Sequence, residues 1–302
     1  MRRHAYLITA YDDFYLLGRL LETLDDPRND IYLHVDRRSP DVPFDRLRSK
    51  VKQSDLVVVE RIPVYHGEYS QVDSEFALME AALKKAEDYS YLHLISGSDL
   101  PIKSQDFIHE FFRTHDGNEF LDFSEITPKK EEWVRYLYPL GRLRRSESKL
   151  QRVSYRLLRR LALAVQRGLR FDRRRAFDGE IKTGSDWYSV TPSLARLAVS
   201  QRDNLRRMFK FSYIPTEFIM PTVAWNSSYR ERVFSGAPGD HGNMRLIDWQ
   251  RGGPYVFRSG DFEELSSSEM LFARKFDSRR DRAVVDRVCE SLGQSSRAHE
   301  DP

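Results

Sequence analysis

The first 125 residues alternate two kinds of apolar pattern, and this alternation constrains the fold more than any other feature of the chain. Short apolar runs predict strands, at 5–10, 31–35, 56–59, 91–95 and 120–123. Between them, apolar residues at helical spacing predict helices, at 14–24, 70–86 and 107–112. Strands that alternate with helices form a mainly parallel, twisted sheet with helices on both faces. The predicted fold class is therefore α/β.

Polar residues that follow the predicted strands are the first candidates for a site, because α/β proteins bind ligands beyond the carboxyl ends of their strands. Asp36 follows the second strand. It suits a ribose hydroxyl or a base edge, or else it caps the following turn. Asp99 follows the fourth strand in Ser96-Gly-Ser-Asp99, where glycine lets the backbone approach a ligand. The alternative for Asp99 is a turn held by its own side-chain hydrogen bonds.

Positive charge is concentrated in one segment. The chain has 302 residues and a formal net charge of +3. Residues 142–175 contain thirteen Arg or Lys and two acidic residues, so they carry +11 and leave −8 for the rest of the chain. Leucine, alanine and valine recur at helical spacing between these arginines, which predicts a basic amphipathic helical insertion.

Three interpretations of the segment 142–175 are open. It is a surface helix with an Arg-rich outer face, an interfacial helix on anionic lipid, or a nucleic-acid patch. The sequence disfavours nucleic acid, because the segment lacks interleaved aromatic residues and no recognition motif accompanies it.

The cysteine content indicates a reducing compartment. Cys289 is the only cysteine, so no internal disulfide can form. No stretch has the pattern of a signal peptide or of a membrane span. We therefore expect a cytoplasmic protein. We also expect residues 291–302 to form a frayed, disordered tail.

Glu217 is a candidate general base. It lies between Pro215 and the apolar run Phe218-Ile-Met220. Partial burial of a carboxylate raises its proton affinity towards values useful in catalysis. The alternative is structural, since glutamate is also favoured in the first turn of a helix, and Pro215-Thr216 is a plausible helix start.

Arg251, Arg274 and Lys275 are candidates for binding a diphosphate. The last two are adjacent inside the apolar frame of Leu271-Phe-Ala-Arg-Lys-Phe276. A departing nucleoside diphosphate needs its charge neutralised, either by fixed cations or by Mg²⁺. Asp-x-Asp, which often holds that metal in sugar transferases, is absent, so we expect no metal. Adjacent side chains on a strand point to opposite faces, so both cations can line one site only if the strand ends between them.

Seven segments, in order over residues 4–277, give the chain a resemblance to the core-2/I-branching enzyme family of glycosyltransferases, which includes the peptide O-xylosyltransferases. The segments are His4-Ala-Tyr-Leu-Ile8, Asp30-Ile-Tyr-Leu-His-Val-Asp36, Tyr91-Leu-His-Leu-Ile-Ser-Gly-Ser-Asp-Leu-Pro-Ile-Lys-Ser104, Gly184-Ser-Asp-Trp187, Pro215-Thr-Glu217, Arg245-Leu-Ile-Asp-Trp249 and Leu271-Phe-Ala-Arg-Lys-Phe-Asp277.

The resemblance implies one GT-A-like domain over residues 1–290, and inverting, metal-independent transfer from a UDP-sugar. No further cofactor is implied. By position, Glu217 corresponds to the general base, and Arg251, Arg274 and Lys275 to the diphosphate-binding residues. Asp36 corresponds to a residue beside the uridine. Asp99, Ser185 and Trp187 fall near the sugar and the acceptor.

Departures from the family pattern bear on the substrate. The family often has Trp-Gly where this chain has His66-Gly67, close to the expected donor. GlcNAc and xylose are the donor sugars that the resemblance favours.

Animal relatives are cysteine-rich Golgi membrane proteins, so this chain is more similar to a bacterial cytoplasmic member that assembles surface polysaccharide. Its basic helix is then expected to dock on a membrane that carries lipid-linked acceptors. The alternative is a non-catalytic protein that binds a nucleotide sugar or nucleic acid.

Overall fold

The computed structural model describes residues 2–85, 89–145, 148–235 and 242–297. Its main sheet has five strands in the order β3-β2-β1-β4-β6. β1 pairs in parallel with β2 and β4, β2 pairs in parallel with β3, and only β6 is antiparallel to its neighbour. The bounds are β1 Arg3–Ala10, β2 Asn29–Val35, β3 Asp55–Val58, β4 Tyr89–Ser96 and β6 Tyr188–Val190.

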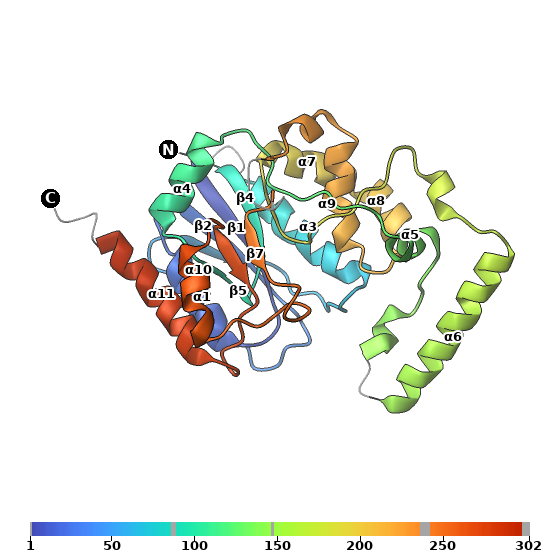
Figure 1. Cartoon of the computed structure of the whole chain (residues 1–302), viewed down its shortest axis with the longest axis horizontal. Coiled ribbons are helices and arrows are strands. Elements are labelled where there is room, and N and C mark those ends of the chain that lie inside the picture. Colours follow the sequence, from blue (N-terminus) through green and yellow to red (C-terminus); the bar gives the residue numbers. More distant parts are fainter. Residues whose placement is uncertain (1, 86–88, 146–147, 236–241, 298–302) are drawn as a thin grey trace.

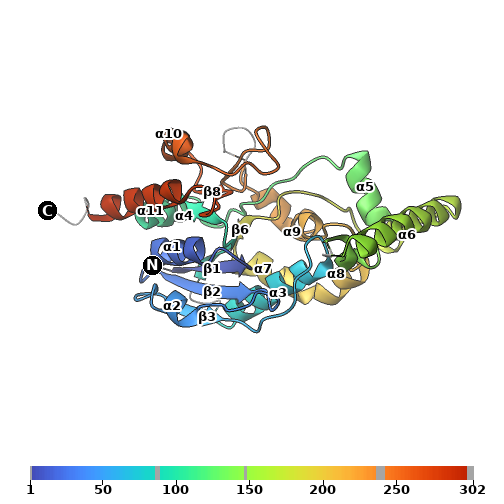
Figure 2. The same ribbon diagram turned by 90° about the horizontal axis from the view of Figure 1, so that it is seen from below.

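Each central strand contributes to two hydrophobic cores, because successive side chains of a strand point to opposite faces. On β1, Tyr6 and Ile8 pack in one core, whereas Ala5 and Leu7 pack in the other. All four are fully buried. Strands buried on both faces need helices on both sides, as Figure 2 shows.

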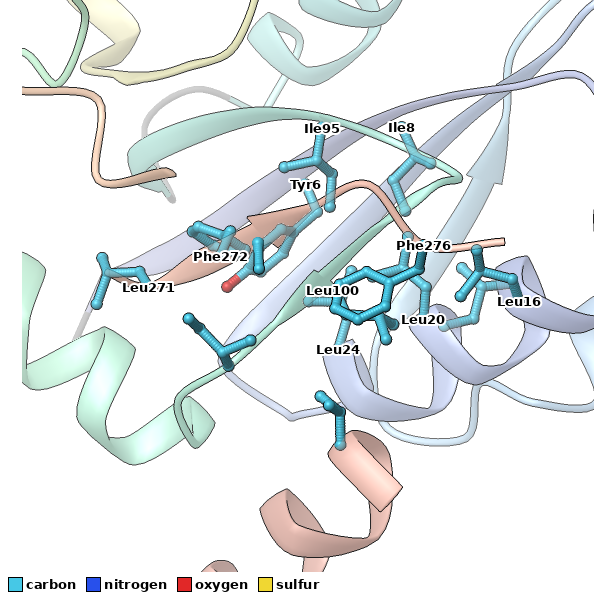
Figure 3. Packing of buried hydrophobic residues seen from close by; sticks show 14 of the residues in the cluster. Tyr6, Ile8, Leu16, Leu20, Leu24, Ile95, Leu100, Leu271, Phe272 and Phe276 are labelled. Carbon is cyan, nitrogen blue, oxygen red and sulfur yellow. The ribbon is translucent and has the colours of Figure 1, made fainter. Parts of the chain in front are cut away.

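The first core lies between the main sheet and the helices α1 (Phe14–Leu24), α4 (Gln105–Thr114) and α11 (Arg282–Arg297). α1 begins at Asp13, whose carboxylate accepts a hydrogen bond from the Leu16 amide at 3.1 Å. Its leucines recur every three or four residues and are fully buried. Figure 3 shows three of them, Leu16, Leu20 and Leu24, in the same cluster as Phe276.

A second, three-stranded sheet borders this core, in the order β5-β8-β7. Its strands are β5 Asp99–Pro101, β7 Arg245–Ile247 and β8 Phe272–Arg274. The parallel pairing of β7 with β8 and the antiparallel pairing of β5 with β8 bring the C-terminal third of the chain to the end of β4. α10 (Phe262–Ser267) packs beside α11.

The second core lies on the other face of the main sheet, under α3, α7, α8 and α9. These helices are α3 Tyr69–Leu83, α7 Pro192–Ser200, α8 Arg202–Phe209 and α9 Thr216–Trp225. A short helix, α2 Phe44–Arg48, packs against α1.

Residues 128–145 and 148–176 form an arm beyond α8 and α9. Figure 1 shows it at the side of the molecule, away from the main sheet. It contains α5 (Pro128–Arg135), the 3₁₀ turns η2 (Gly141–Arg145) and η3 (Arg173–Ala176), and the long helix α6 (Lys149–Gly168). Within the described residues, no helix is long and apolar enough to cross a membrane.

The structure confirms the predicted α/β class and four of the five predicted strands, with their helices. The strand predicted at 120–123 is wrong. Phe120 forms a single bridge to Ser189 and Ser124 a single bridge to Thr183, because the neighbouring β6 is only three residues long.

The tail predicted at 291–302 is wrong in its first part, since α11 continues to Arg297. Val284, Val285 and Val288 bury one face of that helix. Residues 298–302 lie outside the described part.

Candidate functional site

A cavity of about 460 Å³ opens at the carboxyl ends of β1, β2 and β4. Its floor is formed by residues that follow these strands, and its walls come from the start of α3, the segment before β6 and the end of β8. The predicted site residues among its lining are Asp36, Trp187, Arg274 and Lys275.

Asp36 lies on the floor and is already hydrogen-bonded. It accepts bonds from the Val64 amide at 3.1 Å and from the Arg38 side chain at 2.8 Å. Burial opposes its charge, but the bonds from Arg38 and Val64 outweigh burial and hold the Asp36 pKa below its ordinary value. Arg38 also lies over the ring of Tyr65, at 4.5 Å. Asp36 thus organises a turn and also faces the cavity, and its binding of a ribose or base edge stays a prediction.

Arg274 is held in place before any ligand binds. Its guanidinium donates to Asp99 at 2.9 Å and to the Ser96 hydroxyl at 3.2 Å. It also stacks over the ring of Trp187, at 4.3 Å from the centroid. Only 15% of its side chain is exposed. A cation fixed on three sides loses little side-chain entropy when an anion arrives.

Asp99 lies behind Arg274 and does not line the cavity. It accepts hydrogen bonds from the Ser96 amide and hydroxyl, at 2.8 and 2.9 Å. This is the side-chain-held turn that the sequence left as the alternative. The Asp99 carboxylate therefore positions Arg274, and a direct contact of Asp99 with the substrate stays a prediction.

Lys275 lines the cavity together with Arg274, because β8 ends at Arg274. Beyond that point the chain no longer alternates regularly between two faces. In the described part of the chain, the Lys275 ammonium forms no ion pair or hydrogen bond. Two adjacent cations thus face one space, and one of them is free to pair with an anion.

Trp187 forms an aromatic wall of the cavity, next to Arg274. Ser185 is not among the lining residues. Its hydroxyl accepts a hydrogen bond from the Trp187 amide at 3.1 Å, so it shapes the turn that presents the indole. A direct substrate contact of Ser185 stays a prediction.

Two buried or half-buried carboxylates also line the cavity, Glu75 of α3 and Asp186. Neither forms an ion pair within the described residues. Burial, together with the nearby charge of Asp186, raises the pKa of Glu75 well above its ordinary value. Burial raises the pKa of Asp186 as well, against the influence of Arg274 and Lys130. The carboxylates of this wall therefore keep their protons to higher pH than ordinary carboxylates do.

Glu217 lies in the first turn of α9, with one fifth of its side chain exposed. It is not among the cavity lining, but it is coupled electrostatically to Asp186, which is. Burial and Asp186 raise its pKa, while Lys130, in an ion pair at 2.7 Å, opposes the rise. The Glu217 carbonyl accepts a bond from the Gly184 amide at 2.9 Å, which fixes the Asp186 loop against α9.

Arg251 is a further predicted residue that is not among the cavity lining. Its guanidinium is tied to three carboxylates, those of Asp248, Asp261 at 2.8 Å and Glu264 at 2.6 Å. The loop just after it does reach the cavity, at Gly253 and Pro254. A diphosphate contact by Arg251 would require these ion pairs to be exchanged.

Comparison with known proteins identifies the family. The sequence model of the Core-2/I-Branching enzyme family matches residues 4–270. The chain belongs to this family.

Two relatives of this Core-2/I-Branching protein cover most of it at low identity. The Xylosyltransferase sqv-6 of Caenorhabditis briggsae is 22% identical over 89% of this chain and 34% of its own length. The human beta-1,3-galactosyl-O-glycosyl-glycoprotein beta-1,6-N-acetylglucosaminyltransferase 3 is 22% identical over 92% of this chain and 65% of its own length. The chain thus spans from about a third to about two thirds of these relatives. A crystal structure of mouse xyloside xylosyltransferase 1 aligns over 90% of this chain and 97% of its own, with 11% identity and a TM-score of 0.38.

Sequence reasoning missed Glu75, Asp186 and Lys130 in this family member. Glu75 left a signal, because it falls at helical spacing with Val72 and Met79, on the apolar side of α3. Burying a carboxylate among apolar residues is costly, so a glutamate at such a position is a candidate for a function. Lys130 left no signal in the sequence. Its partner Glu217 is 87 residues away along the chain, and only the fold brings the two side chains together.

Proposed function

We propose that this Core-2/I-Branching family member transfers a sugar, GlcNAc or xylose, from a UDP-sugar to a hydroxyl group of a glycan. The single observation that carries the proposal is the pairing of Arg274 and Lys275 in one cavity at the sheet edge. Two adjacent cations match the charge of a departing diphosphate. We propose that they remove the need for a metal ion.

The proposed step is a single displacement. The acceptor oxygen attacks the anomeric carbon, the bond from that carbon to the diphosphate oxygen breaks, and UDP leaves with the electron pair. Glu217 takes the proton of the attacking hydroxyl. Its raised pKa supports this role, because a base works best when its pKa approaches the working pH. Attack opposite to the leaving group inverts the anomeric centre.

The other cavity residues have supporting roles in this proposal. Asp36 lies beyond β2, where it can bind the uridine ribose once a ligand displaces a bond from Arg38. Trp187 offers a flat face to the donor sugar. As acceptor we propose a glycan or lipid-linked glycan of surface-polysaccharide assembly in the cytoplasm.

The test uses the full chain with a panel of nucleotide sugars. UDP release and product formation should occur with UDP-GlcNAc or UDP-xylose, and they should persist in EDTA. NMR of the product should give a β-linkage from the α-linked donor. Strict dependence on Mn²⁺ would refute the metal-free step. Thermal stabilisation by UDP without transfer from any donor would instead favour a non-catalytic nucleotide-sugar-binding protein.

A further inference from the structure

The helix α6 presents a broad apolar face to solvent. Its exposed apolar residues recur at helical spacing over the whole length of the helix. Leu150 is 76% exposed, Leu161 is 63% exposed and Leu169, at the C-cap, is 75% exposed. Between them lie Val153, Leu157, Leu158 and Val165, each more than 40% exposed. A helix of 20 residues extends about 30 Å, so this face is larger than the isolated exposed residues that monomers usually carry.

The body of the protein covers only the opposite side of α6. Tyr155 and Leu163, two turns apart, are the buried residues of the helix. Leu163 packs with Tyr136 and Tyr138 in a small core of its own. Figures 1 and 2 agree that α6 lies at the edge of the molecule with nothing beyond it. α6 is therefore a surface helix, as one of the three interpretations has it, but its outermost face carries leucines and not arginines alone.

Arginines flank the apolar face. Arg156, Arg160 and Arg167 are exposed and lie along one edge of it, by helical spacing. Within the described part of the chain, Arg167 pairs with Glu132, and Arg156 and Arg160 have no ion pair. Apolar residues bordered by cations are typical of helices that lie in the plane of a membrane interface.

The charge of the whole chain favours one occupant for this face. Residues 142–175 carry +11 while the remainder carries −8. An anionic surface therefore attracts the arm and repels the body, which orients the molecule. A second copy of the chain would bring two segments of +11 together, so like charges oppose that alternative.

We propose that α6 docks the protein on an anionic lipid bilayer, with its leucine face at the boundary between headgroups and acyl chains. Leu157 and Leu161 insert, and Arg156 and Arg160 pair with lipid phosphates. The proposal does not depend on sugar transfer, because vesicle binding is measured without any nucleotide sugar.

The experiment is flotation of the full chain with two kinds of vesicle, pure phosphatidylcholine and an equal mixture with phosphatidylglycerol. Binding to the mixed vesicles should exceed binding to the neutral ones. It should weaken when salt rises from about 0.1 M to about 1 M, because the Debye length falls from about 10 to about 3 Å. Equal binding to both vesicles, or none to either, would overturn the proposal.

Two double variants locate the binding surface. Arg156→Gln with Arg160→Gln should weaken binding roughly thirty-fold, at roughly fivefold per charge near a membrane. The matched control, Arg46→Gln with Arg48→Gln on α2, removes the same charge from exposed positions and should have little effect. Leu157→Gln with Leu161→Gln should weaken binding at least about tenfold, since both side chains lose apolar burial. The control for this pair is Phe107→Gln, an exposed apolar residue on α4.

Three results would count against the proposal. Controls that weaken vesicle binding as much as the α6 variants would show that overall charge, and not this helix, binds lipid. A dimer in solution that the leucine variants dissociate, without vesicle binding, would assign the face to a second copy. Salt-sensitive binding to RNA or DNA, lost in the arginine variant and without vesicle binding, would assign it to nucleic acid.

Discussion

The two walls of the cavity differ in how the protein treats charge. On the basic wall, Arg274 is clamped by Asp99 and Trp187, and Lys275 stands beside it. On the acidic wall, Glu75 and Asp186 have no ion pair within the described residues, and Glu217 next to them has Lys130. The basic wall thus has a cation held by fixed partners, whereas the carboxylates of the acidic wall have raised pKa values.

This difference has a physical reason. A guanidinium keeps its proton in any environment, so neighbours serve only to orient it. A carboxylate in a desolvated place can be tuned by small changes in the charges around it. The walls should therefore respond differently to substitution, in turnover on the acidic side and in nucleotide affinity on the basic side.

The largest expected effect is at Glu217, next to the acidic wall. Glu217→Gln should lower the rate of sugar transfer by roughly 10²–10⁴-fold, because the amide cannot accept the proton of the acceptor hydroxyl. The dissociation constant for UDP, from calorimetry, should stay the same. Glu180→Gln, an exposed glutamate in an ion pair with Lys182, serves as control. Retained turnover in the Glu217 variant would show that Glu217 is not the base. The acidic side would then no longer differ from the basic side by its effect on turnover.

The basic wall should show the next largest effect. Lys275→Ala should weaken UDP binding by roughly 10- to 150-fold, since a hydrogen bond to a charged group contributes about 1.5–3 kcal/mol. The same calorimetric titration measures it, with the exposed Lys84→Ala as control. Unchanged affinity would mean that the diphosphate lies elsewhere.

Two opposed pH shifts would sharpen the comparison. Burial and Asp186 raise the pKa of Glu217, and Lys130 lowers it. Transfer needs the ionised base, so activity falls as pH drops through that pKa. Lys130→Met should raise the pKa further and move the acid limb of the kcat/KM profile to higher pH. Asp186→Asn should move the limb to lower pH. Limbs that stay in place in both variants would show that Glu217 does not set the profile.

The smallest effect should come from Arg251→Ala. Its three carboxylate partners hold the guanidinium away from the cavity, so UDP affinity should fall less than in Lys275→Ala. A loss as large as that of Lys275→Ala would show that the loop rearranges and that Arg251 joins the basic wall when nucleotide binds.

Prediction from sequence succeeded where the signal is local and failed where it is not. Strands such as β1 and helices such as α1 follow from apolar spacing within a few residues. The strand at 120–123 failed, because a strand needs a partner and only the fold decides which one is near. In the site, the residue types of Arg274 and Glu217 were informative. The clamp of Asp99 on Arg274 spans 175 residues, and no sequence pattern encodes a contact of that kind.

Gly184 has a consequence for anyone who wishes to re-engineer the protein. A methyl group at this position would lie 1.9 Å from the carbonyl oxygen of Asp122, so the two backbones touch where they cross. Asp186 and Trp187 follow within three residues, and their reach into the cavity is set by that crossing. In a library that randomises residues 183–188 and is selected for folding, glycine should be recovered at 184 in almost every survivor, and altered acceptor choice should come from its neighbours.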